Sequence, residues 1–299
     1  MNILITGAWS GWESCRKALE AMGHQVVFLQ QEKDPLPVPF EWVEGTVCNG
    51  LFMHHGIEKF PNLKYIQLTS AGFDRLPVEQ AKARSIRVNN ARGVYSVPMA
   101  EFALGGVLQL YKKSRFFWEN QHLHRWEKHR SLLELAGKTV CILGCGSVGT
   151  ECAKRFHAFG CRVVGVDLYP RENGEYDEMH PLETLDKVLA RTDVIVLTLP
   201  LTEDTRHLLD VRRFAVLKPG AVLVNIARGA VVDTEALVRA LDNNLGGAVL
   251  DVFEEEPLSD NSPLWDLENV ILTPHNSFVG QGNAERLAQI IMNNLEKET

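Results

Sequence analysis

Three polar side chains in the C-terminal third of the sequence each follow an apolar run typical of a buried strand. Arg228 comes after a run that ends at Asn225, Glu256 after one that ends near Asp251, and His275 after a third run. Because parallel strands present their carboxyl ends at one edge of a sheet, we expect the three side chains to meet there. An arginine can hold a carboxylate at two points, and a glutamate beside a histidine favours its protonated form. The set is therefore suited to anchoring a 2-keto acid on Arg228 while His275 donates a proton to the carbonyl oxygen during hydride transfer.

Each of these residues alone also has an ordinary structural explanation. Arg228 could form a surface ion pair, Glu256 could belong to a solvated acidic run, and His275 could cap a strand end. Glu254 and Glu255 share that acidic run, and without a second histidine nearby we predict that they are solvated charges rather than metal ligands. The functional interpretation therefore depends on the three residues occurring together behind a dinucleotide-binding loop.

A glycine-rich turn has the features of that loop. It joins the apolar run Thr139–Leu143 to a helical pattern over 150–159, which is the context that a dinucleotide-binding motif requires. The turn consists of Gly144, Cys145, Gly146, Ser147, Val148 and Gly149. Its glycines permit a tight turn, the close approach of a pyrophosphate and close packing of the helix on the strand. A tight turn without a ligand is the alternative, and the context makes it the weaker one.

Asp167 ends the next predicted strand, Arg162–Asp167, and follows the last glycine of the turn by 18 residues. At that spacing a carboxylate can accept hydrogen bonds from both ribose hydroxyls of NAD. The same charge would repel the 2′-phosphate of NADP, and the nearest following arginine, Arg171, lies four positions further on. We therefore predict NAD as the cofactor, in preference to NADP.

Short apolar runs alternate with helical patterns along most of the chain, which predicts an α/β fold with parallel sheets and crossover helices. The turn at 6–13 has the same strand-to-helix context but lacks the GxGxxG spacing, so it indicates a second doubly wound domain rather than a second nucleotide site. One long helix is expected over 97–117, and the last helix over 283–295. The predicted strands are 2–6, 25–29, 64–69, 87–89, 139–143, 162–167, 193–199, 221–225, 248–251 and 270–273.

Composition narrows the class of protein. The chain has 299 residues, enough for two domains, and its 31 basic and 38 acidic side chains give a net charge of −7. That charge offers no basic surface to nucleic acid or anionic lipid, and no apolar run approaches the roughly 18 residues of a membrane span. The six cysteines lack CxxC spacing, and His122, His124 and His129 cannot share one helix face, so we expect neither disulfides nor a bound metal. These features favour a cytoplasmic protein that binds neither nucleic acid nor membranes.

Five motifs, in this order, resemble the D-isomer-specific 2-hydroxyacid dehydrogenase family, which includes phosphoglycerate and D-lactate dehydrogenases and glyoxylate/hydroxypyruvate reductases. The motifs are LAGKTVCILGCGSVG at 135–149, LPLT at 199–202 with Thr205, VNIARGAVVD at 224–233, LDVFEEEPL at 250–258 and NVILTPH at 269–275. The resemblance covers nearly the whole chain. It implies an oxidoreductase that interconverts a small 2-keto acid and the D-2-hydroxy acid, with glyoxylate or hydroxypyruvate as expected substrates.

The resemblance also implies an architecture. A Rossmann NAD-binding domain at 94–275 would be inserted into a flavodoxin-like substrate domain made of 1–93 plus 276–299. Relatives form dimers through the cofactor domain, so we expect a homodimer with the segment 97–126 as its arm.

Site residues follow from the same resemblance. Arg228 would bind the substrate, His275 would act as acid and base, and Glu256 would be its partner, in agreement with the chemistry above. Further cofactor contacts are expected at Pro200, Thr205, Ile226, Ala227 and Asp251, with Asp251 on the nicotinamide carboxamide. Substrate contacts are expected at Ser70, Ala71 and Gly72, the last two through backbone N–H groups.

Departures from the family pattern bear on the substrate. Phe278 stands close after His275, where relatives have small residues, so we expect it to shape the substrate end of the site. The segment 47–55, which we expect to be a loop, is rich in aromatic and histidine side chains. Few basic residues lie in the loops expected to face the substrate, and this disfavours a phosphorylated substrate. A dinucleotide-sensing, corepressor-like protein on the same fold is the alternative function. Formate dehydrogenase fits less well, because that relative has glutamine in place of Glu256.

Overall fold

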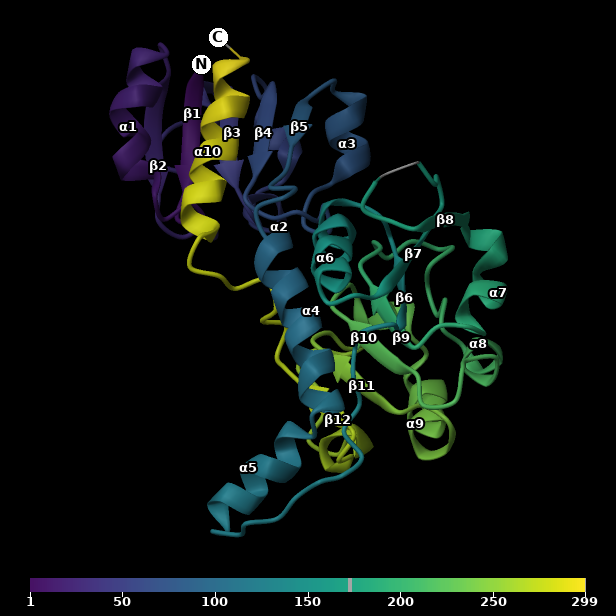
Figure 1. Cartoon of the computed structure of the whole chain (residues 1–299). Coiled ribbons are helices and arrows are strands. Elements are labelled where there is room, and N and C mark those ends of the chain that lie inside the picture. Colours follow the sequence, from purple (N-terminus) through teal and green to yellow (C-terminus); the bar gives the residue numbers. More distant parts are fainter. Residues whose placement is uncertain (172–173, 299) are drawn as a thin grey trace. The chain divides into compact units, whose positions relative to one another are not determined.

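The chain folds as two units in a computed structural model that describes residues 1–171 and 174–298 (Figure 1). One unit consists of Met1–Tyr95 and the C-terminal segment that begins at Gly280, and the other is Ser96–Val279. Each unit has a parallel sheet with helices on both faces, which confirms the predicted α/β class. No helix in the described part of the chain is long and apolar enough to cross a bilayer. The cytoplasmic location stays a prediction.

The N-terminal unit is built on a five-stranded sheet in the order β2-β1-β3-β4-β5, the flavodoxin-like order. Its strands are β1 (Asn2–Thr6), β2 (Gln25–Leu29), β3 (Gly45–Cys48), β4 (Tyr65–Leu68) and β5 (Arg87–Asn89). Alternate side chains of each strand enter two different cores. Helices α1 (Trp12–Ala21) and α10 (Asn283–Glu296) cover the face of Ile3 and Ile5, whereas α2 (Leu51–His54) and α3 (Val78–Ala83) cover the face of Leu4.

The expectation of a loop at 47–55 is wrong. Strand β3 begins at Gly45, pairs with β1 on one side and β4 on the other, and is followed by helix α2. All four residues of β3 are buried, so the sequence has no polar and apolar alternation there. A central parallel strand buried on both faces lacks that signal, and this one is also short and contains a glycine.

The second unit contains a seven-stranded sheet in the order β12-β11-β10-β9-β6-β7-β8. The strands are β6 (Thr139–Leu143), β7 (Arg162–Asp167), β8 (Glu178–Pro181), β9 (Val194–Leu197), β10 (Val222–Asn225), β11 (Gly247–Leu250) and β12 (Val270–Leu272). Numbered from β6, this is the Rossmann order with one added strand at the β12 edge. Helices α4 (Ser96–Tyr111) and α6 (Ser147–Ala158) cover one face, and α7 (Leu185–Leu189), α8 (Val211–Ala215) and α9 (Thr234–Asn243) cover the other.

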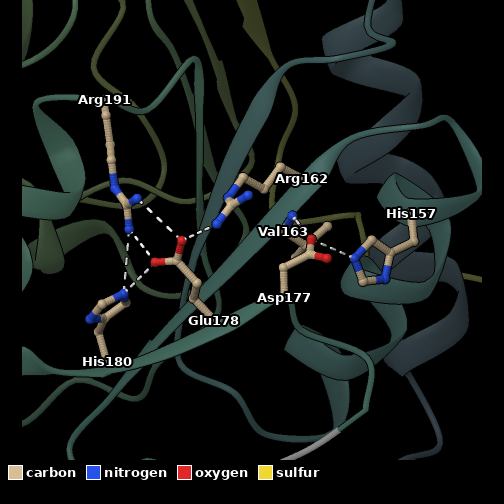
Figure 2. Close-up of polar contacts among 7 residues, drawn as sticks. All are labelled: His157, Arg162, Val163, Asp177, Glu178, His180 and Arg191. Carbon is tan, nitrogen blue, oxygen red and sulfur yellow. Dashed lines mark hydrogen bonds and ion pairs between the residues drawn. The ribbon is translucent and has the colours of Figure 1, made fainter.

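Strand β8 is absent from the predicted strands because its sequence, Glu-Met-His-Pro, has no strand signal. It forms an edge of the sheet, where a proline is tolerated. Figure 2 shows the carboxylate of Glu178 between Arg162 and Arg191, with the Nε2 atom of His180 at 2.7 Å from its Oε2. Hydrogen bonds from Arg191, His180 and Arg162, in that order of size, hold the pKa of Glu178 far below its usual value. The contacts of Glu178 thus help to hold β8 at the sheet edge, although its sequence lacks the apolar alternation of a strand.

The single helix predicted over 97–117 is interrupted. Helix α4 ends at Tyr111, and a second helix, α5 (Ser114–His122), follows it. Between them Lys113 has a φ of 51°, in the left-handed region, which ends an α-helix. The break falls within four consecutive polar residues, 112–115, and the prediction of one helix overlooked them because apolar residues lie on both sides.

Candidate active site

The glycine-rich turn lies where the sequence predicts it, between β6 and α6, at the carboxyl end of the sheet. Gly144 has a φ of 96°, which a residue with a side chain rarely adopts. A Cβ atom on Gly149 would lie 2.2 Å from the carbonyl oxygen of Gly144, so the helix packs this closely on the turn only because residue 149 is glycine. Gly146 precedes α6 without a side-chain cap, which leaves N–H groups of the first turn available to an anion.

Asp167 ends β7 beside this turn, and its carboxylate is already engaged with it. The Cys145 N–H donates to Oδ2 at 2.7 Å, and the Tyr169 N–H donates to Oδ1 at 3.0 Å. A carboxylate has about four acceptor positions, so two oxygens with one bond each can still accept hydroxyl groups. The turn, the helix terminus and this carboxylate therefore fit the pyrophosphate and ribose of a dinucleotide.

Cys145 contributes its backbone rather than its thiol to the turn. Its side chain is directed toward Gly165 of β7, where a Cβ atom would lie 2.7 Å from the sulfur. Burial raises the pKa of the Cys145 thiol to about 12, so the side chain is a neutral packing group under the loop.

Other residues expected to touch the cofactor are placed with their side chains inside the unit. Thr205 is buried, and its hydroxyl donates to the Pro200 carbonyl oxygen at 2.8 Å and accepts the Thr202 N–H at 2.7 Å. Ile226 and Ala227 are buried in the cores on opposite faces of the sheet. Thr205 thus organises the loop after β9, and the cofactor contacts of these residues stay predictions.

Asp251 organises the chain around His275. Its side chain is fully buried and accepts hydrogen bonds from the Thr273 hydroxyl at 2.6 Å, the Asn276 N–H at 2.7 Å and the Ser277 N–H at 2.9 Å. The Asp251 carbonyl oxygen also accepts the His275 N–H at 2.7 Å. His275 has a φ of 51°, a conformation unfavourable for a residue with a side chain. Bonds on both sides of His275 hold it in that conformation and so aim its ring.

The His275 ring meets Glu256. Its Nδ1 atom lies 2.9 Å from the Glu256 Oε2 atom, and the Phe253 N–H donates to Oε1 at 3.1 Å. With a proton on Nδ1 directed at the carboxylate, Nε2 is the nitrogen left for a substrate. Both side chains are partly exposed, at 45% for His275 and 38% for Glu256. The Phe278 ring stands nearly perpendicular to the imidazole at 82°, with a centroid distance of 6.2 Å.

Arg228 lies in the segment after β10, and a buried asparagine shapes that segment. The Asn225 side chain accepts the Ala227 N–H and donates to the Arg228 carbonyl oxygen, both at 3.1 Å. The Arg228 Nη1 donates to the Ala227 carbonyl oxygen at 2.8 Å. A Cβ atom on Gly229 would lie 1.8 Å from the Phe253 carbonyl carbon, so the segments that carry Arg228 and Glu256 are neighbours.

Glu254, which we predict to be a solvated charge, is exposed and also makes specific hydrogen bonds. Its Oε1 lies 2.5 Å from the Nε2 of His207, and its Oε2 accepts the Thr234 N–H at 3.0 Å and the Thr234 hydroxyl. Burial acts to raise the pKa of Glu254, but the bonds from Thr234 and His207 outweigh it and lower the pKa overall. The acidic run therefore contains one residue that joins three segments, beside Glu256, which pairs with His275.

The residues expected to bind the substrate carboxylate belong to the N-terminal unit. In the turn after β4 the Ser70 hydroxyl donates to the Gly72 carbonyl oxygen at 3.0 Å, and the Asn90 amide donates to the Ala71 carbonyl oxygen at 2.6 Å. Both contacts use carbonyl groups, and the substrate-binding role of the turn stays a prediction.

Sequence reasoning missed Asn225 and Thr273, which shape the segments of Arg228 and His275. The available signal was a polar side chain at the end of an apolar strand, which must find a partner when it is buried. Among the described residues, no group of three or more His, Cys, Asp or Glu side chains could hold a metal ion.

Comparisons with known proteins are consistent with this geometry. Residues 104–277 match the family model described as D-isomer specific 2-hydroxyacid dehydrogenase, NAD binding domain. A glyoxylate reductase from Thermofilum pendens is 36% identical over 248 residues, which cover 79% of this chain and 71% of that protein.

Two solved structures extend the comparison. A D-isomer specific 2-hydroxyacid dehydrogenase family protein from Aeromonas salmonicida has a TM-score of 0.85 and 34% identity, covering 98% of this chain and 94% of that one. A D-isomer specific 2-hydroxyacid dehydrogenase from Xanthobacter autotrophicus, in complex with NADPH and MES, has a TM-score of 0.81 and 31% identity, covering 99% and 95%.

Proposed function

Since this chain belongs to the D-isomer specific 2-hydroxyacid dehydrogenase family and is an NAD-dependent oxidoreductase, we propose that it reduces a small 2-keto acid to the D-2-hydroxy acid. Glyoxylate and hydroxypyruvate are the first candidates, because a similar protein is a glyoxylate reductase. The observation that carries the proposal is the 2.9 Å contact between His275 Nδ1 and Glu256 Oε2, which leaves Nε2 for the substrate.

The reduction adds two electrons and two hydrogens to the keto group. Bound NADH supplies the hydride that reaches the keto carbon. Protonated His275 donates the proton from Nε2 to the carbonyl oxygen, and Glu256 stabilises the imidazolium before that transfer. The Arg228 guanidinium binds the substrate carboxylate and so orients the keto carbon. In the reverse direction neutral His275 accepts the hydroxyl proton.

The residues that would hold the cofactor lie at the carboxyl end of the second sheet. Backbone N–H groups of the turn 144–149 would bind the pyrophosphate, and Asp167 would bind the ribose hydroxyls. We favour NAD over NADP because the Asp167 carboxylate would repel a 2′-phosphate. A similar solved protein is in complex with NADPH, so this preference needs a test of its own.

Purified protein is assayed for loss of NADH absorbance with glyoxylate, hydroxypyruvate, pyruvate, a branched 2-keto acid and a phosphorylated one. We expect turnover with a small keto acid, a loss of kcat of roughly 10² to 10⁴ in His275→Ala, and both a higher KM and a lower kcat in Arg228→Ala. His157→Ala and Arg239→Ala are the matched controls, since both residues lie on helical surfaces away from this edge. Binding of NADH without reduction of any acid would instead favour a dinucleotide-sensing protein.

We also propose that the protein is a homodimer joined through α5 and the segment that follows it. Trp118, Leu123 and Trp126 are 65%, 55% and 97% exposed there, and a hollow of about 810 Å³ lies between Phe117 and Arg130. Large apolar side chains gathered on one surface are typical of an interface. Light scattering should give twice the mass of one chain, and Leu123→Ser with Trp126→Ser should lower it. A single-chain mass for the unaltered protein would reject the dimer.

A further inference from the structure

The carboxyl end of the N-terminal sheet holds a carboxylate that the proposed reaction does not use. Glu32 lies in the loop after β2, and its Oε1 accepts the Thr6 hydroxyl at 2.8 Å and the Asn49 N–H at 2.7 Å. Its Oε2 accepts the Gly50 N–H at 2.6 Å. Donors from the ends of two strands, β1 and β3, therefore converge on one side chain that belongs to neither.

The carboxylate of Glu32 lies where the strand order of this sheet reverses. Strand β1 lies between β2 and β3, so the chain leaves β1 toward one side of the sheet and later continues on the other side. Doubly wound sheets bind their ligands at this point. In this unit Glu32 spans the ends of β1 and β3 and accepts hydrogen bonds from donors at both.

The segment that Glu32 holds leads directly toward residues assigned to the substrate. Gly50 is followed by α2, where Met53 is 66% exposed. The end of β3 is bonded to the end of β4, since the Thr69 N–H donates to the Cys48 carbonyl oxygen at 2.9 Å. The turn at 70–72, which we assign to the substrate carboxylate, begins immediately after Thr69.

We propose that Glu32 is a positioning residue for substrate recognition: by binding Asn49 and Gly50 it sets the start of α2 beside the turn at 70–72. This inference rests on the proposed reduction of a keto acid, and it adds a residue that controls how the substrate is held.

Glu32→Gln tests the charge without changing the size of the side chain. One amide oxygen can keep two of the bonds, but the amide nitrogen is a donor and cannot accept the Gly50 N–H. We expect the KM for the keto acid to rise about tenfold, with kcat changed less than about threefold and the KM for NADH unchanged. Thr6→Val, which removes a single donor, should raise the same KM by a smaller factor. Glu13→Gln on α1 is the matched control, because Glu13 makes no hydrogen bond or ion pair with the described residues.

Glu32→Ala adds a test that is independent of turnover. The truncated site keeps two N–H groups and one hydroxyl, which a small carboxylate can satisfy. We expect formate to raise the melting temperature of Glu32→Ala and to leave those of the unaltered protein and of Glu13→Ala unchanged.

Two outcomes would overturn the inference. An unchanged KM for the keto acid in folded Glu32→Gln and Thr6→Val would do so and would leave the proposed function intact. A loss of kcat together with a higher KM for NADH would also do so, because it would mean general damage rather than positioning. If the unaltered protein reduces no keto acid, the proposed function fails, and the absence of a formate-dependent melting shift in Glu32→Ala would then reject the inference as well.

Discussion

The two sheets place a carboxylate at corresponding positions and use it differently. In the second unit Asp167 ends β7, the second strand of its sheet, and accepts the Cys145 N–H from the turn after the first strand. In the N-terminal unit Glu32 follows β2, again the second strand, but it reaches past β1 to the N–H groups of Asn49 and Gly50. Asp167 therefore borders a glycine-rich turn, whereas Glu32 binds the residues that follow β3.

The glycine content of the turns accounts for part of this difference. In the turn after β6 a Cβ atom on Gly149 would meet backbone at 2.2 Å, so that turn is packed against the start of α6 without side chains between. In the turn after β1, Trp9 and Trp12 are buried in the core instead. Both α1 and α6 begin after a glycine without a side-chain cap, so the two turns differ in what lies beside them: tightly packed glycines in one unit and buried tryptophans in the other. The fold alone therefore does not decide which of the two sheets binds a ligand where its strand order reverses.

The largest expected effect comes from adding one methyl group to each turn. Gly149→Ala places a carbon 2.2 Å from the Gly144 carbonyl oxygen, so the turn must move, and we expect the KM for NADH to rise at least about tenfold. Gly11→Ala meets only the Trp9 indole nitrogen, at 3.6 Å, and should leave that KM unchanged. Equal effects in steady-state kinetics would contradict the contrast between the two turns.

Replacing Asp167 or Glu32 by alanine should show that the first acts on the cofactor and the second on the substrate. Asp167→Ala removes the partner of the ribose hydroxyls and the charge that opposes a 2′-phosphate, so the ratio of kcat/KM for NADH to that for NADPH should fall about tenfold or more. Glu32→Ala should leave this ratio unchanged while it raises the KM for the keto acid. Parallel titrations with both nucleotides measure the ratio. A shift of nucleotide preference in Glu32→Ala would place Glu32 at the cofactor, which contradicts the comparison.

The smallest expected effect concerns the stability of the sheet edges and its dependence on pH. Arg191, His180 and Arg162 lower the pKa of Glu178 (Figure 2), and the Asn2 N–H and Lys64 lower the pKa of Glu44 in the N-terminal unit. A carboxyl group with a lowered pKa stabilises the fold above its unfolded-state pKa of about 4.3, and this contribution is lost as the pH falls further.

At pH 7 we therefore expect Glu178→Gln to lower the melting temperature by roughly 2–4 °C, and Glu44→Gln by less, since two arginines and a histidine bond to Glu178. Both differences from the unaltered protein should shrink between pH 5 and pH 3. Melting curves across this range check the sign. A difference for Glu178→Gln that grew toward acid pH would show that the cluster does not stabilise the fold through the charge of Glu178.

Local signals predicted the parts of the fold that depend on neighbouring residues. Strand β6, the glycine turn and α6 follow one another without a gap, and their apolar spacing and glycines are sufficient to identify them. Strands β3 and β8 were missed for opposite reasons, since one is buried on both faces and the other is a polar edge strand. The break at Lys113 was missed because apolar residues lie on both sides of the polar segment 112–115.

Sequence patterns were sufficient to predict the α/β class, the dinucleotide turn with Asp167, and the order in which Arg228, Glu256 and His275 follow their strands. Three-dimensional packing was needed to show that Asp251 holds the chain on both sides of His275, that Glu254 bonds His207 and Thr234, and that Glu32 binds Asn49 and Gly50. The physical reason is that these bonds join residues 17 to 47 positions apart. The distances between these bonded residues depend on strand order and register. Spacing along the chain does not determine strand order or register.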